Sequence, residues 1–231
     1  MNTMTAVQRS SGGRLVSVEG KDLPLKSVAV RAEAEGGLAR VVLSQLFANP
    51  HAEPLKVSYS VPLPADGAVA GYEIRIGDRV IRGEIDRRES ARERFEEAIL
   101  RGETAAILDQ ERANLFTQEL GNVPPHVEVA IEVTVDQRLG WLVEGMWEWR
   151  FPTVAAPRYL GGEGRVPDAD KVTMDVAETP LGVRASLELR IGDELTGTKI
   201  PVSPSHAIVC EGSRVTLPAE GATLDRDLVV R

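Results

Sequence analysis

Hydrophobic and polar residues alternate with a period of two along much of this chain. The alternation is most regular from His126 to Asp136, where aliphatic residues occupy every odd position. Successive side chains of a β-strand point to opposite faces, so the pattern predicts a strand with one buried and one solvated face. Similar patterns predict further strands at residues 38–47, 55–61, 69–76, 80–85, 172–176, 183–191, 207–209 and 214–217.

One segment departs from this rhythm. Its apolar residues recur at helical spacing, at Ala91, Phe95, Ala98 and Ile99. Asp86 and Glu89 precede this stripe with the spacing of a capping box, in which each side chain bonds a free backbone N–H of the first helical turn. Gly102 follows where a helix commonly ends in a residue with positive φ. The sequence therefore predicts one helix over about residues 87–101.

Turn residues separate the expected strands. Gly77 and Asp78 form a two-residue hairpin signal between two of them. Gly121 and Asn122 tolerate positive φ, while Pro124 and Pro125 fix φ and delay strand pairing. The segment 121–125 is therefore predicted to be a turn that leads into the regular strand.

Three aromatic residues share one parity in a further strand, at Trp147, Trp149 and Phe151. Residues of one parity lie on one face of a strand, so we expect all three in the core. Pro152 and Pro157 bracket the exit from this strand, and a glycine-rich stretch follows at 161–164. That composition is typical of a loop between modules.

These patterns predict a mainly β fold: an antiparallel β sandwich with one well-formed helix, followed by a smaller β-rich module. The expected organisation is a flexible lead-in at 1–22, the sandwich at 23–160, a linker at 161–170 and a β-rich connector at 171–231.

Charge and composition narrow the functional classes. The 231 residues carry 27 Lys and Arg against 35 Asp and Glu, a net charge of -8. A net negative surface disfavours nucleic acid and anionic lipid as partners. A single cysteine, Cys210, cannot form an internal disulfide or a zinc site with several thiolates. No stretch approaches the ~20 apolar residues of a membrane helix. Residues 1–16 lack the apolar core of a secretory signal, so we expect a cytoplasmic location by default.

Candidate chemistry is sparse. The histidines, His51, His126 and His206, lie far apart in sequence, and the chain has no CxxC pair, so we expect no metal site and no cofactor. Ser205 precedes His206, but without a GxSxG elbow this pair is more typical of a turn than of a hydrolase. An acidic row at Glu128, Glu132 and Asp136 is expected to be a solvated strand face rather than a catalytic pair.

The ordered motifs resemble a VIT domain, the module named for vault protein and inter-alpha-trypsin inhibitor heavy chain. The resemblance covers roughly residues 26–159 and depends on the order of short motifs: 72–77, 81–85, the helix, 105–108 with Phe116, 121–125, 151–153 and 157–159. The motif residues that we expect to set the fold are Asp86, Glu89, Phe95, Gly102, Gly121, Asn122, Pro124, Pro125, Pro152, Pro157, Arg158 and Tyr159.

The resemblance implies a protein-binding or structural unit with no established activity of its own. Such domains usually precede a von Willebrand A-type domain, whose D-x-S-x-S motif is absent from this sequence. We therefore expect a non-catalytic interaction module within a larger protein. Its expected partner is another protein or an adjacent A-type domain. Two alternatives stay open: a carbohydrate- or peptide-binding sandwich, and a hydrolase that uses Ser205 or His126.

Overall fold

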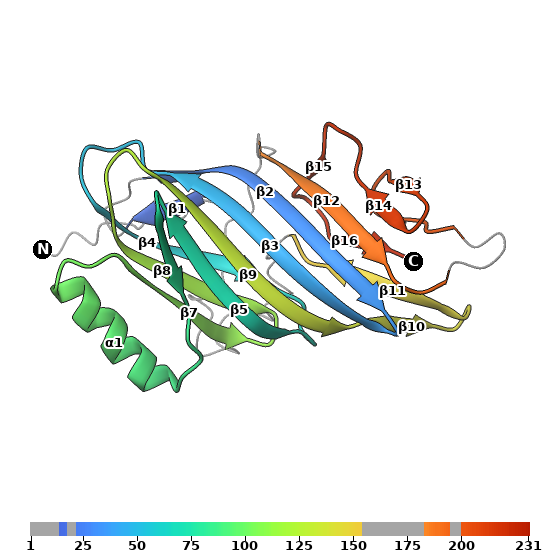
Figure 1. The fold of residues 1–231 in the computed structure, drawn as a ribbon, viewed down its shortest axis with the longest axis horizontal. Helices are drawn as coiled ribbons and strands as arrows, with labels where there is room; N and C mark the ends of the chain where they lie inside the picture. The colour runs from blue at the N-terminus through green and yellow to red at the C-terminus, as the bar shows by residue number, and fades with distance from the viewer. Residues whose placement is uncertain (1–13, 18–21, 154–182, 195–199) are drawn as a thin grey trace, which may run out of the picture.

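The computed structural model describes residues 14–17, 22–153, 183–194 and 200–231 (Figure 1). Within them one helix, α1 (Arg88–Leu100), accompanies the strands. The strands are β1 (Arg14–Ser17), β2 (Asp22–Glu35), β3 (Leu38–Ala48), β4 (Leu55–Pro62), β5 (Ala68–Ile76), β6 (Arg79–Arg82), β7 (Ala105–Arg112), β8 (Leu115–Val123), β9 (Glu128–Arg138), β10 (Gly140–Leu142), β11 (Met146–Phe151), β12 (Arg184–Ile191), β13 (Val209–Glu211), β14 (Arg214–Thr216), β15 (Ala222–Thr223) and β16 (Leu228–Val230).

The main sheet runs in the order β6-β5-β9-β3-β2-β1-β4-β8-β7. The strand β2 connects β1 and the strands beyond it to β3 and the strands on the other side. It pairs with β3 along one edge and with two different strands along the other. Residues 22–24 pair with β1, whereas residues 28–34 pair with β12. A register shift between Leu25 and Ser27 lies between these two pairings. Figure 1 shows β4, β7 and β8 behind the layer formed by β5, β9, β3 and β2.

One core fills the space between the two layers. Val41 and Val133 from β3 and β9 are fully buried, and so are Val57 and Leu120 from β4 and β8. All four belong to one apolar cluster. This burial follows the period-two pattern of each strand, since alternate side chains face inward. The mainly β fold with one helix near residues 87–101 is confirmed.

The strand predicted from His126 begins two residues later, at Glu128. Pro125 and His126 form a turn, and His126 has a φ of 56°. The hairpin turn predicted at Gly77 and Asp78 is confirmed, with Gly77 at a φ of 56°.

The prediction that all three aromatic residues of β11 lie in the core is wrong for Trp147. Trp149 and Phe151 are buried, but Trp147 is 38% exposed. The difference arises because β11 is paired with β16 only at residues 149–151, whereas residues 146–148 pair with β10. Trp147 thus lies on a two-stranded hairpin at the end of the sandwich.

Strands of the main sheet also occur in the predicted lead-in at 1–22 and in the predicted connector at 171–231. β1 lies in the predicted flexible lead-in and pairs with β2 and β4. β12 lies in the predicted connector and pairs with β2 in parallel, a geometry that requires a long crossover rather than a hairpin. The predicted linker at 161–170, the strand at 172–176 and the motif residues Pro157, Arg158 and Tyr159 lie outside the described residues.

Because β12 shares hydrogen bonds and core with β2, we expect the chain to unfold as one unit. Replacing the buried Leu189 of β12 by alanine should lower the free energy of unfolding by about 2–5 kcal/mol, since the substitution leaves a cavity. Urea unfolding followed by far-ultraviolet circular dichroism and by tryptophan fluorescence should give one coincident transition for both proteins. Two separate transitions, of which Leu189→Ala shifts only one, would contradict the shared sheet.

Candidate functional site

The helix α1 packs against β7 and brings several predicted motif residues together. Phe95 is its buried side chain. Gly121 of β8 lies directly beneath Ile99, because a Cβ added to Gly121 would lie 2.0 Å from the Ile99 Cδ1 atom. Gly121 does not have a positive φ. The predicted reason for this glycine was therefore wrong: it is needed for close packing of the helix, not for turn geometry.

The C-terminal end of α1 is closed by Gly102 and Asn122. Gly102 has a φ of 74° and donates its N–H to the Ile99 carbonyl at 3.0 Å, while the Glu103 N–H donates to the Ala98 carbonyl at 2.9 Å. This pair of bonds is a Schellman motif. Asn122, at a φ of 54°, donates its side-chain amide to the carbonyls of Ile99 and Glu103, at 3.1 and 2.9 Å. The predicted helix stop is confirmed.

The capping box predicted at the start of α1 is wrong. The N-cap is Arg87, and no side chain bonds the first turn there. Since the helix begins at Arg88, Asp86 and Glu89 are displaced by one position from the capping-box register. The Asp86 carboxylate instead accepts the Arg87 N–H at 2.7 Å and pairs with Arg94 at 2.9 Å.

Charged groups fix α1 on the sheet around Phe95. The Arg92 guanidinium binds the Glu119 carboxylate at 2.7 Å and also the Asp109 carboxylate. Burial alone would lower the pKa of Arg92, but these two carboxylates outweigh burial and raise it. Arg92 and the Lys56 amine both lie 5.7 Å from the centre of the Phe95 ring. Of the predicted motif residues, Phe95, Gly102, Gly121 and Asn122 thus lie where α1 docks on the sheet, and the Asn122 amide holds the C-terminal end of the helix.

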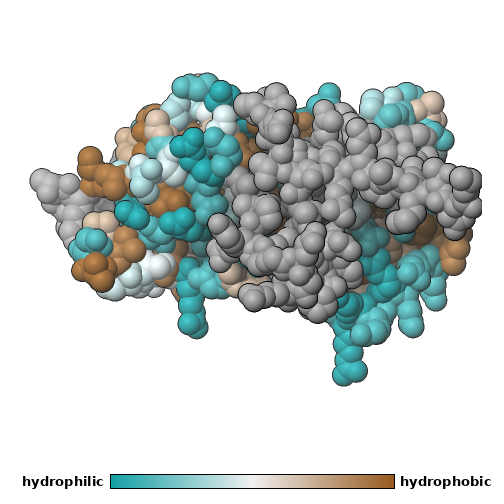
Figure 2. All heavy atoms as spheres, turned by 180° about the vertical axis from the view of Figure 1, so that it is seen from behind, coloured by the Kyte–Doolittle hydropathy of each residue, from teal (hydrophilic) through white to brown (hydrophobic). Residues whose placement is uncertain are grey.

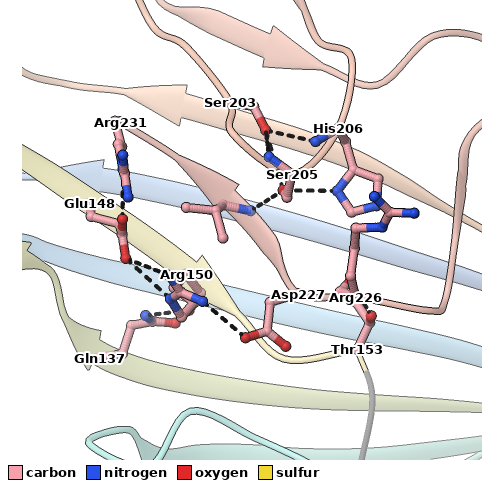
Figure 3. A network of polar contacts seen from close by, with 11 residues as sticks. Gln137, Glu148, Arg150, Thr153, Ser203, Ser205, His206, Arg226, Asp227 and Arg231 are labelled. Carbon is pink, nitrogen blue, oxygen red and sulfur yellow. Dashed lines mark hydrogen bonds and ion pairs between the residues drawn. The ribbon is translucent and has the colours of Figure 1, made fainter.

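The C-terminal strand β16 is held on both sides (Figure 3). Its three residues, Leu228 to Val230, are all buried. Along one edge it pairs with β11. Along the other, Arg231 and Val202 exchange backbone hydrogen bonds at 2.9 and 3.0 Å, and the Ser205 hydroxyl accepts the Val229 N–H at 3.0 Å. The end of the described chain is therefore part of the core.

An ion-paired network surrounds this strand. The Glu148 carboxylate accepts bonds from Arg231 at 2.7 Å and from Arg150 at 3.0 Å, and Arg150 also pairs with Asp227 at 3.3 Å. Burial alone would raise the pKa of Glu148, but the bonds from Arg231 and Arg150 outweigh it and lower the pKa. We call Glu148, Arg150, Ser205, Asp227 and Arg231 the C-terminal clasp.

The neighbouring Ser205 and His206 form the bend that the sequence favoured. The Ser203 hydroxyl accepts the N–H groups of Ser205 and His206, at 3.3 and 3.1 Å. The His206 Nδ1 atom lies 2.9 Å from the Ser205 hydroxyl, and burial together with the Arg226 charge lowers the pKa of His206. Among the described residues, no carboxylate is hydrogen-bonded to His206, and Ser205 is engaged with β16. His126 lies elsewhere, in the turn before β9.

The acidic row of β9 lies on the solvated face, as predicted. Asp136 is bonded by Arg40 at 2.7 Å, and Glu132 accepts a bond from Ser44 at 3.1 Å. An open hollow of about 750 Å³ between the ends of β2, β3, β9 and β12 includes the Arg40–Asp136 pair in its lining. Within the described ranges, no three His, Cys, Asp or Glu side chains are grouped to hold a metal ion.

Sequence reasoning did not find the C-terminal clasp. Its members come from three distant segments, and β16 is only three residues long, so no periodicity could mark it. The available signal was the apolar run at 228–230, flanked by Asp227 and Arg231.

In the part of the chain that the structure describes, no helix has the length and apolar character needed to cross a bilayer.

Sequence comparisons with known proteins identify the family of one part of the chain. The family model of the vault protein inter-alpha-trypsin domain, VIT, matches residues 25–135. The mouse protein mono-ADP-ribosyltransferase PARP4 is 35% identical over 112 residues, covering 48% of this chain and 6% of that protein. The mouse von Willebrand factor A domain-containing protein 5A is 25% identical over 223 residues, covering 93% of this chain and 28% of that protein. The chain thus spans less than a third of either relative.

Similarity to solved structures is weaker. A structure of yeast LTA4 hydrolase in complex with bestatin aligns with a TM-score of 0.47 and 9% identity, covering 98% of this chain and 31% of that one. A TM-score below 0.5 does not establish a shared fold.

We expect Gly121→Ala to displace α1, because the new methyl group would overlap Ile99. The free energy of unfolding should fall by about 1–3 kcal/mol, measured by urea unfolding. Gly71→Ala is the matched control, since Gly71 also lies in a strand but its nearest atoms would be 3.4 Å from a Cβ. Combining Gly121→Ala with Ile99→Val should recover part of the loss. Equal effects of Gly121→Ala and Gly71→Ala would contradict this packing role.

We expect the C-terminal clasp to weaken in acid. The pKa of Glu148 is lower in the folded chain than its ordinary value of 4.5. Its stabilising contribution is therefore complete above about pH 4.5 and is lost as the pH falls through the lowered folded value. Glu148→Gln should lower the free energy of unfolding by about 2 kcal/mol at neutral pH. Urea unfolding should show this difference shrinking below pH 4.5; a difference that is independent of pH would contradict it.

Proposed function

Residues 25–135 of this chain are a VIT domain, and from that premise we propose that the chain is a non-catalytic interaction module that packs against an A-type domain of its parent protein. Relatives named as von Willebrand factor A domain-containing proteins support this pairing, since mouse, rat and human proteins of that name match 93% of the chain. The chain covers 27–28% of their lengths, which leaves room in them for further domains.

The C-terminal clasp is the observation that carries the proposal. It engages the Ser205 hydroxyl, the side chain with the best claim to nucleophilic chemistry, as an acceptor for the backbone of β16. It also ties Arg231 to the core through Glu148. The position and direction of the backbone at Arg231 are therefore fixed. A neighbouring domain joined at Arg231 would be held in a defined orientation.

The two alternatives from the sequence have less support. A sugar-binding sandwich needs exposed aromatic rings on a concave face, but Trp149 and Phe151 are buried. The exposed rings of Trp141 and Trp147 pack edge to face, with centroids 4.6 Å apart, on the two-stranded β10–β11 hairpin. A hydrolase would need a carboxylate to orient His206, and no carboxylate among the described residues is hydrogen-bonded to that ring.

The proposal predicts direct binding of the parent protein's A-type domain. Titration calorimetry of the 231-residue chain with this domain, supplied as a separate polypeptide, should give a Kd of roughly 1–100 µM, because contacts between domains of one chain resemble transient interfaces. A β sandwich of similar size and charge should not bind and serves as the control. A parent protein without an A-type domain, or a domain that produces neither heat nor chemical cross-links, would contradict the proposal.

A further inference from the structure

Apolar side chains lie exposed on both faces of the β10–β11 hairpin. We call Trp141, Val143, Met146 and Trp147 the hairpin patch. Val143, in the connecting turn, is 98% exposed, and Trp141 is 61% exposed. Figure 2 shows hydrophobic surface at the end of the molecule that carries this hairpin, at the left of the view. Exposed apolar residues that gather in one place mark interaction surfaces, whereas single ones do not.

The two tryptophans of the hairpin patch are packed against their surroundings. Besides the edge-to-face contact of its two indole rings, Trp147 packs against the turn between β2 and β3. A Cβ added to Gly37 in this turn would lie 2.8 Å from the Trp147 ring. The Leu139 N–H, just before β10, donates to the Gly37 carbonyl at 2.8 Å. A surface whose side chains are already ordered loses little entropy when it binds a partner.

The direction of β16 shows where a segment that continues this strand would run relative to the hairpin patch. β16 runs antiparallel to β11, with Leu228 opposite Phe151 and Val230 opposite Trp149. The ion pair between Arg231 and Glu148 continues the same register. The next positions along β11 are Trp147 and Met146. Among the described residues, these two pair with β10 on one edge and with no strand on the other.

We propose that the A-type domain docks on the hairpin patch, and that the segment joining it to Arg231 continues β16 along β11. This inference rests on the proposed function and assigns it a surface. A domain tethered beside Trp147 is present at a high effective concentration, which favours it over a second copy of the chain. Glu144 lies exposed next to Val143 in the turn, and the chain carries a net charge of -8, so insertion into an anionic bilayer is disfavoured.

The matched variants are Val143→Asp and Leu100→Asp. Both add one negative charge at an exposed apolar residue, but Leu100, 88% exposed, lies at the end of α1 and outside the hairpin patch. Titration calorimetry with the parent protein's A-type domain should show a Kd raised at least about tenfold by Val143→Asp. Leu100→Asp should leave the Kd within about twofold. Circular dichroism should show both variants folded, because neither side chain belongs to the core.

The outcomes separate the two proposals. If the unsubstituted chain does not bind, the proposed function fails. If it binds and Val143→Asp binds equally well, the function stands and the docking surface is overturned. Two further results would overturn the surface: self-association of the chain in sedimentation velocity that Val143→Asp abolishes, and co-sedimentation with phosphatidylcholine–phosphatidylserine vesicles that depends on Val143.

Discussion

Continuous backbone pairing along β2 is the constraint on which the rest of the structure depends. One edge of β2 is occupied by β3, while the other is divided between β1 and β12. The register shift between Leu25 and Ser27 separates these two pairings. Through this one strand, the layer of β4, β7 and β8 and the strands β12 to β15 are attached to the same sheet, while β16 joins the core through β11. The helix packs on β7 of this sheet, and the C-terminal clasp lies on the β10-β11-β16 sheet beside it.

The polar side chains of both regions stabilise local geometry. Arg92 joins α1 to two carboxylates of the sheet, and Glu148 joins β11 to Arg150 and Arg231. Buried or half-buried charges are costly unless they are paired, so such networks specify one arrangement of the elements they connect. In both places the charges fix a backbone element, α1 or β16, at a defined position.

Regular elements were predictable from the sequence, because their burial pattern is local. The alternation of β9 and the apolar stripe around Phe95 gave the correct element type, and the boundaries moved by only one or two residues. The close approach of Ile99 to Gly121 was not predictable, since a contact between distant segments leaves no periodic signal. The sequence also indicated a buried Trp147, because this residue has the same parity as Trp149 and Phe151. That position lies beyond the part of β11 that pairs with β16, so its side chain is partly exposed. The short strands β1 and β16 were missed because three or four residues show little alternation, although the equally short β14 was predicted at 214–217.

The parallel pairing of β12 with β2 has a consequence for synthesis on the ribosome. Val28 and Ala185 are neighbours in the sheet although more than 150 residues separate them in the chain. Until β12 has left the ribosome, the edge of β2 at residues 28–34, which includes the buried Val28 and Val30, lacks the strand that later pairs with it. An open apolar strand edge can recruit other nascent chains. A polypeptide interrupted before residue 184 would thus be prone to aggregate, and chaperone capture of this edge would protect it during translation.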